Sequence, residues 1–401
     1  MRTSSEMKER AGLRGRDSRA LLVVALAILA SCGEVSSPVA SRTQAELLAR
    51  GPFAVGVAQT TFVDTSRPTQ ASGSFSGSPE RRLDCWVWYP LDRPADGVAS
   101  IQKIAEPSRG GPFPLVMLSH GLSSPPNAQT YLTHHLASHG YVVVAPTFPL
   151  TSMASHTGQA FGVSDLTNQP GDVSFVLDRV LAIAGGGEPT PEGLPDLRGV
   201  IDVETVAAAG LSFGAFTTHL LNFETTLRDE RLDAAVLYAV GDMTRLPEDS
   251  GAPGTSVPSF TPRSAPSLYF SGSRDLLTTP EGSLTTWSTV RSPSWHAEIV
   301  GGTHLWFADA NSHVDGYENP DRFACEFVRG GIGGSVGADV LACVDDGTDP
   351  IIDPPVRQHE LVLAGTLAFL DAILRDDAAS RAFLESGFDG DGDVRVSTNI
   401  R

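Results

Sequence analysis

One serine in this sequence stands where a strand pattern meets a helix pattern, and its surroundings suit nucleophilic chemistry. Residues 210–214 read G-L-S-F-G and match G-x-S-x-G, the pattern of a sharp turn that lifts a serine hydroxyl above the end of a sheet. The small apolar run at 206–209 suits a buried strand, and residues 215–222 suit a helix. Glycines on both sides permit a tight turn, because a Cβ atom at either position would collide with neighbouring main chain. The sequence therefore predicts Ser212 as a nucleophile.

A second match to the same five-residue pattern occurs at 333–337 and contains Ser335. The pattern is short and the chain has 40 glycines among 401 residues, so chance matches are expected. Ser335 lies in a glycine-rich stretch with no strand pattern before it. We interpret this second stretch as a flexible loop.

A serine hydroxyl is a weak nucleophile near neutral pH, so it needs a base that a third group orients. When the serine follows a strand-turn-helix elbow, the acid and then the histidine come later in the chain. Asp275 follows the strand pattern at 267–270, and His304 follows the one at 296–300. Both are expected at the carboxyl ends of strands beside Ser212, which predicts a Ser-Asp-His triad.

Other polar residues compete for these roles. Asp242, after the strand pattern at 232–240, is the best alternative acid. His120 is interpreted as a structural loop residue rather than a base. His135 and His139 are four residues apart in a helix pattern, but no third ligand accompanies them, so no metal site is predicted.

The segments around these residues alternate between strand and helix patterns. Strand patterns lie at 53–57, 60–63, 83–89, 113–118, 141–146, 206–209, 232–240, 267–270 and 296–300. Helix patterns lie at 131–139, 172–184, 215–222 and 360–374. This alternation predicts the α/β class, with a mostly parallel, doubly wound sheet, helices on both faces and function at the carboxyl edge.

Several further segments carry a family resemblance in the same order along the chain. They read G-P-F-A-V-G-V, P-L-V-M-L-S-H-G, L-A-S-H-G-Y-V-V-V-A-P, D-V-S-F-V-L-D, S-G-S-R-D and G-G-T-H, together with the G-L-S-F-G elbow. In these motifs residues 51–308 and the terminal helix resemble α/β-hydrolase serine esterases of the platelet-activating-factor acetylhydrolase-like and predicted dienelactone-hydrolase-like branch, with chlorophyllase-like and cutinase-like members. Leu211 stands where family members commonly have histidine, a change that leaves the chemistry intact.

The resemblance implies the α/β-hydrolase fold and a serine carboxylic ester hydrolase that forms an acyl-enzyme on short-chain or lipid-type esters, without a cofactor or a metal. It also implies an oxyanion hole made by the backbone N–H groups of Phe213 and Leu122. Two alternatives stay open: a polyester or cutin depolymerase of the cutinase-like type, and a catalytically silent lipoprotein that uses the fold for binding. A dienelactone hydrolase proper would need a cysteine where this chain has Ser212.

The start of the chain has the pattern of an export signal. Basic residues precede an uninterrupted apolar run at 20–30, which is too short to span a bilayer permanently. Residues 29–32, L-A-S-C, resemble a bacterial lipobox, which implies cleavage before Cys32 and acylation of its thiol. We therefore expect an exported protein, lipid-anchored to the bacterial cell envelope, with a secreted protein as the alternative.

The charge of the chain argues against nucleic acid as a partner. The formal net charge is −18, and loss of residues 1–31, with six basic and three acidic residues, makes it −21. So acidic a chain is a poor partner for nucleic acid. The predicted partners are a small-molecule or lipid ester and, through the lipid anchor, the membrane. The acidic run at 389–393 lacks the residues that close a calcium loop and is expected to be a solvated tail.

Three cysteines besides Cys32 remain in a chain whose export permits disulfides. Cys325 and Cys343 enclose a glycine-rich loop of 17 residues. Closure of such a loop stabilises a fold by about 3 kcal/mol in the chain-entropy model, and we predict that these two residues are paired. Cys85 falls in an apolar strand pattern and is expected to be a buried thiol.

The expected domain organisation follows from these segments. Residues 1–31 are a signal peptide, 32–50 a tether and 51–401 one α/β-hydrolase domain. Two long irregular segments, 244–265 and 306–357, leave the carboxyl edge of the sheet and are candidate lids. An ester pocket is expected from nearby apolar side chains, namely Phe148, Met153, Phe161, Trp306 and Phe307.

Overall fold

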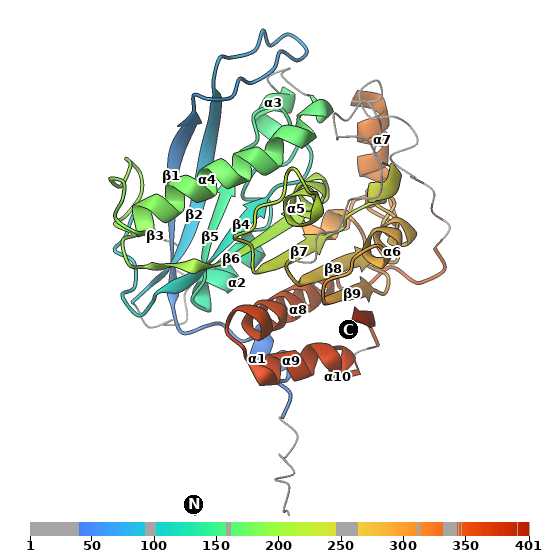
Figure 1. Ribbon diagram of the computed structural model, residues 1–401. Helices are drawn as coiled ribbons and strands as arrows, with labels where there is room; N and C mark the ends of the chain where they lie inside the picture. Colours follow the sequence, from blue (N-terminus) through green and yellow to red (C-terminus); the bar gives the residue numbers. More distant parts are fainter. Residues whose placement is uncertain are drawn as a thin grey trace, which may run out of the picture. The chain divides into compact units, whose positions relative to one another are not determined.

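The computed structural model describes residues 40–92, 102–157, 162–245, 264–310, 313–331, 347–390 and 392–400, together with residues 343 and 345. Within them one sheet of 10 strands has the order β10-β9-β8-β7-β6-β4-β5-β2-β1-β3 (Figure 1). The strands are β1 Ala54–Asp64, β2 Arg81–Leu91, β3 Gln102–Lys103, β4 Phe113–Ser119, β5 Val142–Pro146, β6 Ile201–Leu211, β7 Ala234–Tyr238, β8 Ser267–Gly272, β9 Ser294–Ile299 and β10 Val394–Asn399.

The central strands carry the segments on which the predicted site depends. The strands from β9 through β8, β7, β6 and β4 to β5 run parallel. On the two sides, β2 pairs antiparallel with β5 and with β1, and β10 pairs antiparallel with β9, while the short β3 lies parallel to β1. Every residue of β4, β5 and β7 is buried, which explains their continuous apolar sequences, because helices cover both faces of a sheet of this kind. The predicted mostly parallel α/β sheet is confirmed.

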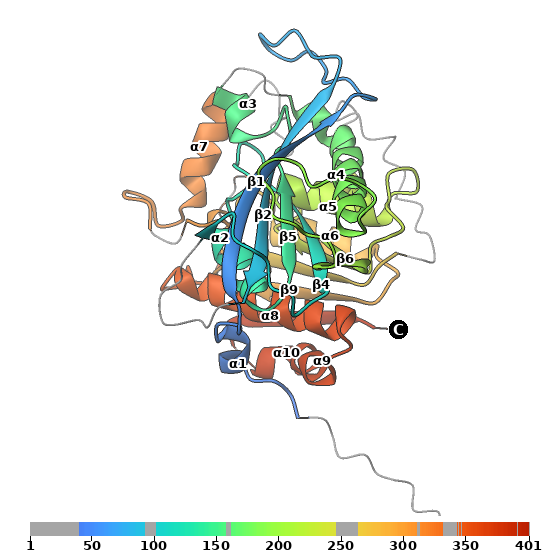
Figure 2. The same cartoon turned by 90° about the vertical axis from the view of Figure 1, so that its left-hand side faces the viewer.

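Helices lie on both faces of the sheet, with α4, α5 and α6 on one face and α1, α2, α8 and α9 on the other. Figure 2 shows α8 running beneath the sheet, with α1, α9 and α10 below it. The helices are α1 Gln44–Leu48, α2 Thr130–Ser138, α3 Met153–Thr157, α4 Gln169–Ala184, α5 Phe213–Phe223, α6 Pro280–Ser288, α7 Asp321–Gly331, α8 Val356–Leu374, α9 Ala378–Glu385 and α10 Gly387–Gly390, with short 3₁₀ turns at Val163–Asn168, Met243–Arg245 and Leu305–Phe307.

The prediction of a tether at 32–50 is wrong in its last part. A capping box between Thr43 and Glu46 starts helix α1, in which each side chain accepts a hydrogen bond from the other residue's backbone N–H. Leu47 of α1 is fully buried in the core beside α8. The folded domain therefore begins before residue 51.

Two histidines, His135 of α2 and His139 directly after its end, hold this N-terminal segment in place. The Nε2 atoms of His135 and His139 each lie 2.9 Å from a backbone carbonyl oxygen, of Leu47 and Ala49 respectively. Burial lowers the pKa of His135 to about 3, so its imidazole is neutral. Among the described residues, no group of His, Cys, Asp or Glu side chains has the arrangement of a metal site.

The acidic run at 389–393 is not a free solvated tail, which corrects the expectation. It leads into β10, an edge strand that pairs antiparallel with β9. The Asp393 carboxylate accepts a hydrogen bond from Arg357 at 3.0 Å, and its backbone carbonyl accepts one from the Val300 N–H at 2.8 Å. The end of the chain thus extends the sheet beyond the strand that precedes the predicted base.

The two candidate lids differ. Most of 244–265 lies outside the described residues, as does Ser335. The segment 306–357 contains helix α7, so it is not irregular throughout. In the part of the chain that the structure describes, no helix is long and apolar enough to cross a membrane.

Candidate active site

The turn after β6 has the geometry that a nucleophile requires. Ser212 adopts φ 54° and ψ −116°, a strained conformation that places it at the start of α5, and its N–H donates to the Tyr238 carbonyl at 2.8 Å. A Cβ atom at Gly210 would lie 2.1 Å from the Gly214 carbonyl oxygen. One at Gly214 would lie 2.0 Å from the Ser119 carbonyl oxygen. Both glycines of the motif are therefore required by close backbone contacts.

The loop after β4 lies against this turn. An added Cβ atom at Gly121 would be 3.5 Å from Cβ of Ser212, so the next residue, Leu122, is beside the serine. The N–H of Phe213 belongs to the first turn of α5, where amides have no intrahelical acceptor. Within the described residues, the Leu122 amide makes no hydrogen bond either. Two backbone donors thus remain near Ser212.

A chain of hydrogen bonds fixes the shape of that loop. Ser123 has a positive φ of 55°, and its N–H donates to the Thr151 carbonyl at 2.7 Å. Gln169, at the start of α4, donates to the Thr151 hydroxyl at 2.7 Å and accepts a bond from Thr217 of α5. The elbow helix and the Leu122 loop are therefore connected through one buried amide. No sequence pattern marked Gln169.

His120 is structural, as the sequence predicted. Its Nε2 accepts a hydrogen bond from the Phe148 N–H at 3.0 Å, so Nδ1 carries the proton and donates to the Gly121 carbonyl at 2.8 Å. Burial lowers the pKa of His120 to about 4, which keeps the ring neutral. Both nitrogens are occupied, so this histidine cannot accept a proton from a substrate.

The structure brings the predicted acid and base together. His304 Nδ1 lies 2.8 Å from Asp275 Oδ2, and both side chains are buried. Nδ1 therefore carries a proton that it donates to Asp275, which leaves Nε2 as the basic nitrogen of the neutral ring. The loops that carry the two residues also touch, because the Arg274 N–H donates to the Gly302 carbonyl at 2.9 Å.

Asp275 is further oriented by its own loop. Its Oδ1 accepts the N–H groups of Leu277 and Thr278 at 2.9 and 2.8 Å, and its Oδ2 accepts the Thr278 hydroxyl at 2.9 Å. Asp242, the alternative acid, instead accepts the Thr244 N–H at 2.9 Å and the Thr244 hydroxyl. The geometry favours Asp275 over Asp242 as the partner of His304.

The charge state of His304 depends on opposing effects. Burial pushes its pKa down, but the nearby carboxylates of Asp275 and Asp321 outweigh burial, and the net result is a raised pKa. Neither His304 Nε2 nor Ser212 Oγ has a hydrogen-bond partner among the described residues. Proton transfer between them requires an approach to about 3 Å.

Two side chains that the sequence did not single out hold the backbone around His304. The amide of Gln358, from α8, accepts the Thr303 N–H at 2.9 Å and donates to the Thr303 carbonyl at 2.8 Å. The carboxylate of Asp321 accepts the His304 N–H at 2.7 Å. Neither residue lies in a motif, and only the contact to the base loop identifies them.

The cysteines lie as predicted, whereas most of the predicted pocket does not. Cys325 and Cys343 form a disulfide, and Cys85 is a buried free thiol. The side chains of Phe148, Trp306 and Phe307 are wholly buried in the core and line neither of the two cavities described below, and Phe161 lies outside the described residues. Aromatic side chains of this size find their lowest free energy in the core when the backbone permits.

Met153 does line a cavity. This cavity has a volume of about 660 Å³ and lies at the carboxyl edge of β5, where Trp86 of β2 and Pro125 and Pro126 of the Leu122 loop also line it. Pro125 is three residues after Leu122, a span of at most about 10 Å, so the loop that carries the predicted oxyanion donor also forms part of the cavity wall.

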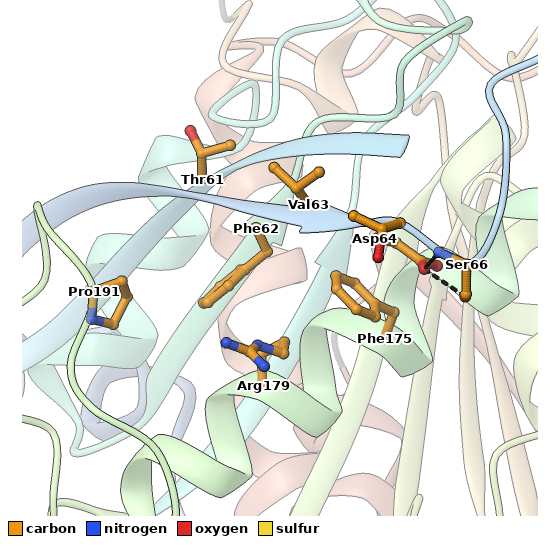
Figure 3. A pocket seen from close by; sticks show the side chains of 9 residues that line it. Thr61, Phe62, Val63, Asp64, Ser66, Phe175, Arg179 and Pro191 are labelled. Atoms are coloured by element: carbon orange, nitrogen blue, oxygen red, sulfur yellow. Dashed lines mark hydrogen bonds between the residues drawn. The ribbon is translucent and has the colours of Figure 1, made fainter. Parts of the chain in front are cut away.

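A second cavity, of about 410 Å³, lies between β1 and α4. Figure 3 shows Phe62 from β1 and Phe175 and Arg179 from α4 around it. None of the residues that line it belongs to the predicted site. We therefore assign the candidate site to the edge at Ser212 and not to this cavity.

Comparison with known proteins is consistent with this architecture. A model of the chlorophyllase family, a family of the α/β-hydrolase type, matches residues 95–168. The match covers less than half of the chain; it includes β4, β5 and Leu122 and ends before Ser212. No curated protein matches the chain. The sheet and this match define an α/β-hydrolase fold, and the match indicates hydrolase activity of the esterase type.

Proposed function

We propose that this protein is a serine carboxylic ester hydrolase that works through an acyl-enzyme. Ser212 is the nucleophile, His304 the general base and Asp275 the residue that orients it. The N–H groups of Phe213 and Leu122 are the oxyanion donors. The observation that supports this proposal best is the buried hydrogen bond of 2.8 Å between Asp275 and His304, on the same sheet edge as a strained serine at a strand-helix turn.

In the acylation step, Ser212 Oγ bonds to the ester carbonyl carbon while its proton moves to His304 Nε2. The carbonyl oxygen takes the negative charge and accepts hydrogen bonds from the two amides, each worth about 3 to 4 kcal/mol of transition-state stabilisation. The bond to the alcohol then breaks, and the imidazolium gives its proton to the leaving oxygen. Water repeats the sequence on the acyl-enzyme and releases the acid.

We infer that the ester is of a short-chain or lipid type. The resemblance to platelet-activating-factor acetylhydrolase-like esterases and the cavity beside Pro125 support this inference. That cavity combines the partly exposed Met153 and Trp86 with polar groups such as Thr60 and Asp84, which suits an apolar chain next to a polar head.

A fluorophosphonate probe tests the nucleophile directly. We expect it to label the wild-type protein at Ser212, as located by peptide mass spectrometry. Ser212→Ala should lose labelling and lower the hydrolysis of a p-nitrophenyl short-chain ester by about 10⁶-fold in kcat, with an unchanged unfolding temperature. Labelling at Ser335, or unchanged activity of the variant, would contradict the proposal.

We further propose that the mature protein begins at an acylated Cys32 and is held at the bacterial cell envelope. The basic start, the apolar run at 20–30 and the sequence L-A-S-C support this proposal. The intact mass of the mature protein tests it, because an anchored protein carries the added mass of the lipid on Cys32. An unmodified N-terminus at another residue rules the anchor out.

A further inference from the structure

We infer that Asp321 is a positioning residue for catalysis, and that helix α7, which it begins, braces the loops that carry the acid and the base. This inference rests on the proposed ester hydrolase function. Asp321 lies outside every motif in the chain, 46 positions after Asp275 and 17 after His304. Its carboxylate is fully buried, yet no arginine or lysine is paired with it among the described residues. A carboxylate in that situation must be held by other donors.

Three backbone amides supply those donors. Asp321 Oδ2 accepts the His304 N–H at 2.7 Å and the Leu276 N–H at 3.1 Å, and its Oδ1 accepts the Leu305 N–H at 2.9 Å. Leu276 directly follows Asp275, and Leu305 directly follows His304. One side chain therefore fixes the backbone beside the acid and at the base, which sets the separation of the two catalytic side chains.

Asp321 is itself held at both sides. Its N–H donates to the Asn319 amide oxygen at 3.0 Å, and the Asn319 amide nitrogen donates to the Arg274 carbonyl at 2.8 Å. Farther along, Asp345 pairs with Arg274 at 2.7 Å and with Arg322 of α7 at 3.2 Å. Two connections thus join the start of α7 to the loop after β8: the hydrogen bonds of Asn319 and the ion pairs of Asp345.

The disulfide completes this connection. Cys325 of α7 packs against Leu276 and Leu277, and it is bonded to Cys343. The Cys343 N–H donates to the Leu276 carbonyl at 2.7 Å. The disulfide therefore holds α7 against the same loop that Asp321 contacts. Helix α7 is thus attached to this loop by the hydrogen bonds of Asp321 and, four residues later, by the contacts of Cys325.

The Asp321 carboxylate also affects the charge state of His304. The charged groups that act on His304 are Asp275, from the loop after β8, and Asp321, from α7, while α8 contributes the neutral Gln358 next to it. Both carboxylates favour the imidazolium of His304. Burial and the charge of Asp275 raise the pKa of Asp321 itself to about 7, while the charge of His304 and the amide donors of His304 and Leu305 oppose that effect.

The test compares Asp321→Asn with a matched control in the same segment, Asp315→Asn, whose side chain is exposed. Asparagine has only one acceptor oxygen, so at least one of the three amides loses its partner. We expect kcat for a p-nitrophenyl ester to fall about 10²-fold with KM changed by less than about 3-fold, since a small misplacement of a catalytic group has that effect. The control should match the wild type.

A second readout separates positioning from simple destabilisation. Removal of the Asp321 charge should lower the pKa of His304, so the acid limb of the kcat/KM profile moves to lower pH. The titration of the His304 ring by NMR measures the same shift without any substrate. If wild-type protein hydrolyses no ester, the proposed function fails, and this titration still decides the role of Asp321.

A normal kcat together with an unmoved His304 titration in Asp321→Asn would overturn the inference. Where that variant does not fold, Asn319→Ala replaces it, because it removes the two bonds that fix Asp321 relative to Arg274. We expect about a 10-fold loss of kcat in Asn319→Ala. An unchanged kcat in a folded Asn319→Ala protein contradicts the brace.

Discussion

The two halves of the candidate site are built in different ways. The nucleophile half, with Ser212 and the Phe213 amide, is fixed by the backbone of one strand-turn-helix unit, where Gly210 and Gly214 permit contacts that any side chain would block. The base half depends on side chains that reach it from later helices, above all Asp321 of α7.

This difference shows how each half can fail. A change in the nucleophile half acts through local geometry, so it strains the turn itself. A change in the base half can lie far away in sequence and act by releasing a loop. Variants in the two halves should separate these two kinds of failure.

Apart from loss of the Ser212 hydroxyl itself, the largest effect is expected in the base half, at the acid. Asp275→Asn should lower kcat by about 10⁴-fold, because an amide no longer holds His304 in the correct tautomer. Steady-state kinetics on a short-chain ester measure this loss, with Asp242→Asn as the matched control, which should stay within about 2-fold of wild type. Reversed results would make Asp242 the acid and break the assignment of the base half.

In the nucleophile half, a change at Gly214 is expected to act through the local geometry of the turn. An alanine Cβ atom would lie 2.0 Å from the Ser119 carbonyl oxygen, and it cannot be accommodated without moving backbone. We expect Gly214→Ala to lower the free energy of unfolding by about 3 kcal/mol, and to reduce kcat by about 10²-fold as the turn shifts. Gly392→Ala, where nothing lies within 4 Å, is the control for denaturant unfolding. A wild-type result for Gly214→Ala would show that the turn is not fixed by contact.

Removal of the Cys325–Cys343 disulfide tests whether contacts outside the site support the base half. Replacing Cys325 and Cys343 by serine should lower the free energy of unfolding by about 3 kcal/mol. It should also reduce kcat by about 10-fold at temperatures well below unfolding, because α7 is then less firmly held. Wild-type protein treated with a thiol reductant should show the same loss. Full activity in the folded double variant would mean that the disulfide stabilises the fold without bracing the site.

The smallest effect is a displacement along the pH axis. Catalysis needs neutral His304, and its pKa is raised above the usual 6.5 because Asp275 and Asp321 outweigh burial. The imidazolium of His304 therefore persists to higher pH. As it loses its proton, kcat/KM should rise through a single ionisation with its midpoint above pH 6.5. A midpoint below that value would show that burial dominates.

Much of the fold and of the nucleophile half could be predicted from the sequence. Apolar runs such as 113–118 and 141–146 became β4 and β5, because a strand covered on both faces must be apolar throughout. The turn at Ser212 was predictable because Gly210 and Gly214, which lack Cβ atoms, permit the close backbone contacts of a tight turn. Asp275 and His304 each follow a strand pattern, which predicted that both lie at the same edge of the sheet.

What the sequence could not reveal depends on contacts between distant segments. Helix α1 falls within the predicted tether, and five residues are too few to form a stable helix alone, so only packing of Leu47 beside α8 stabilises it. The expected pocket residues Trp306 and Phe307 went to the core.

The sequence by itself predicted Ser212 as the nucleophile, Asp275 and His304 as acid and base in that order, and the strands that carry them, since these predictions follow from a tight-turn pattern and from periodicity. The tertiary structure alone decided how Asp275 and His304 are held. Asp321 and Gln358 have no distinguishing pattern, because a single acceptor for a backbone N–H requires only a carboxylate or amide in the right place. That place exists only after α7 and α8 have packed against the loops.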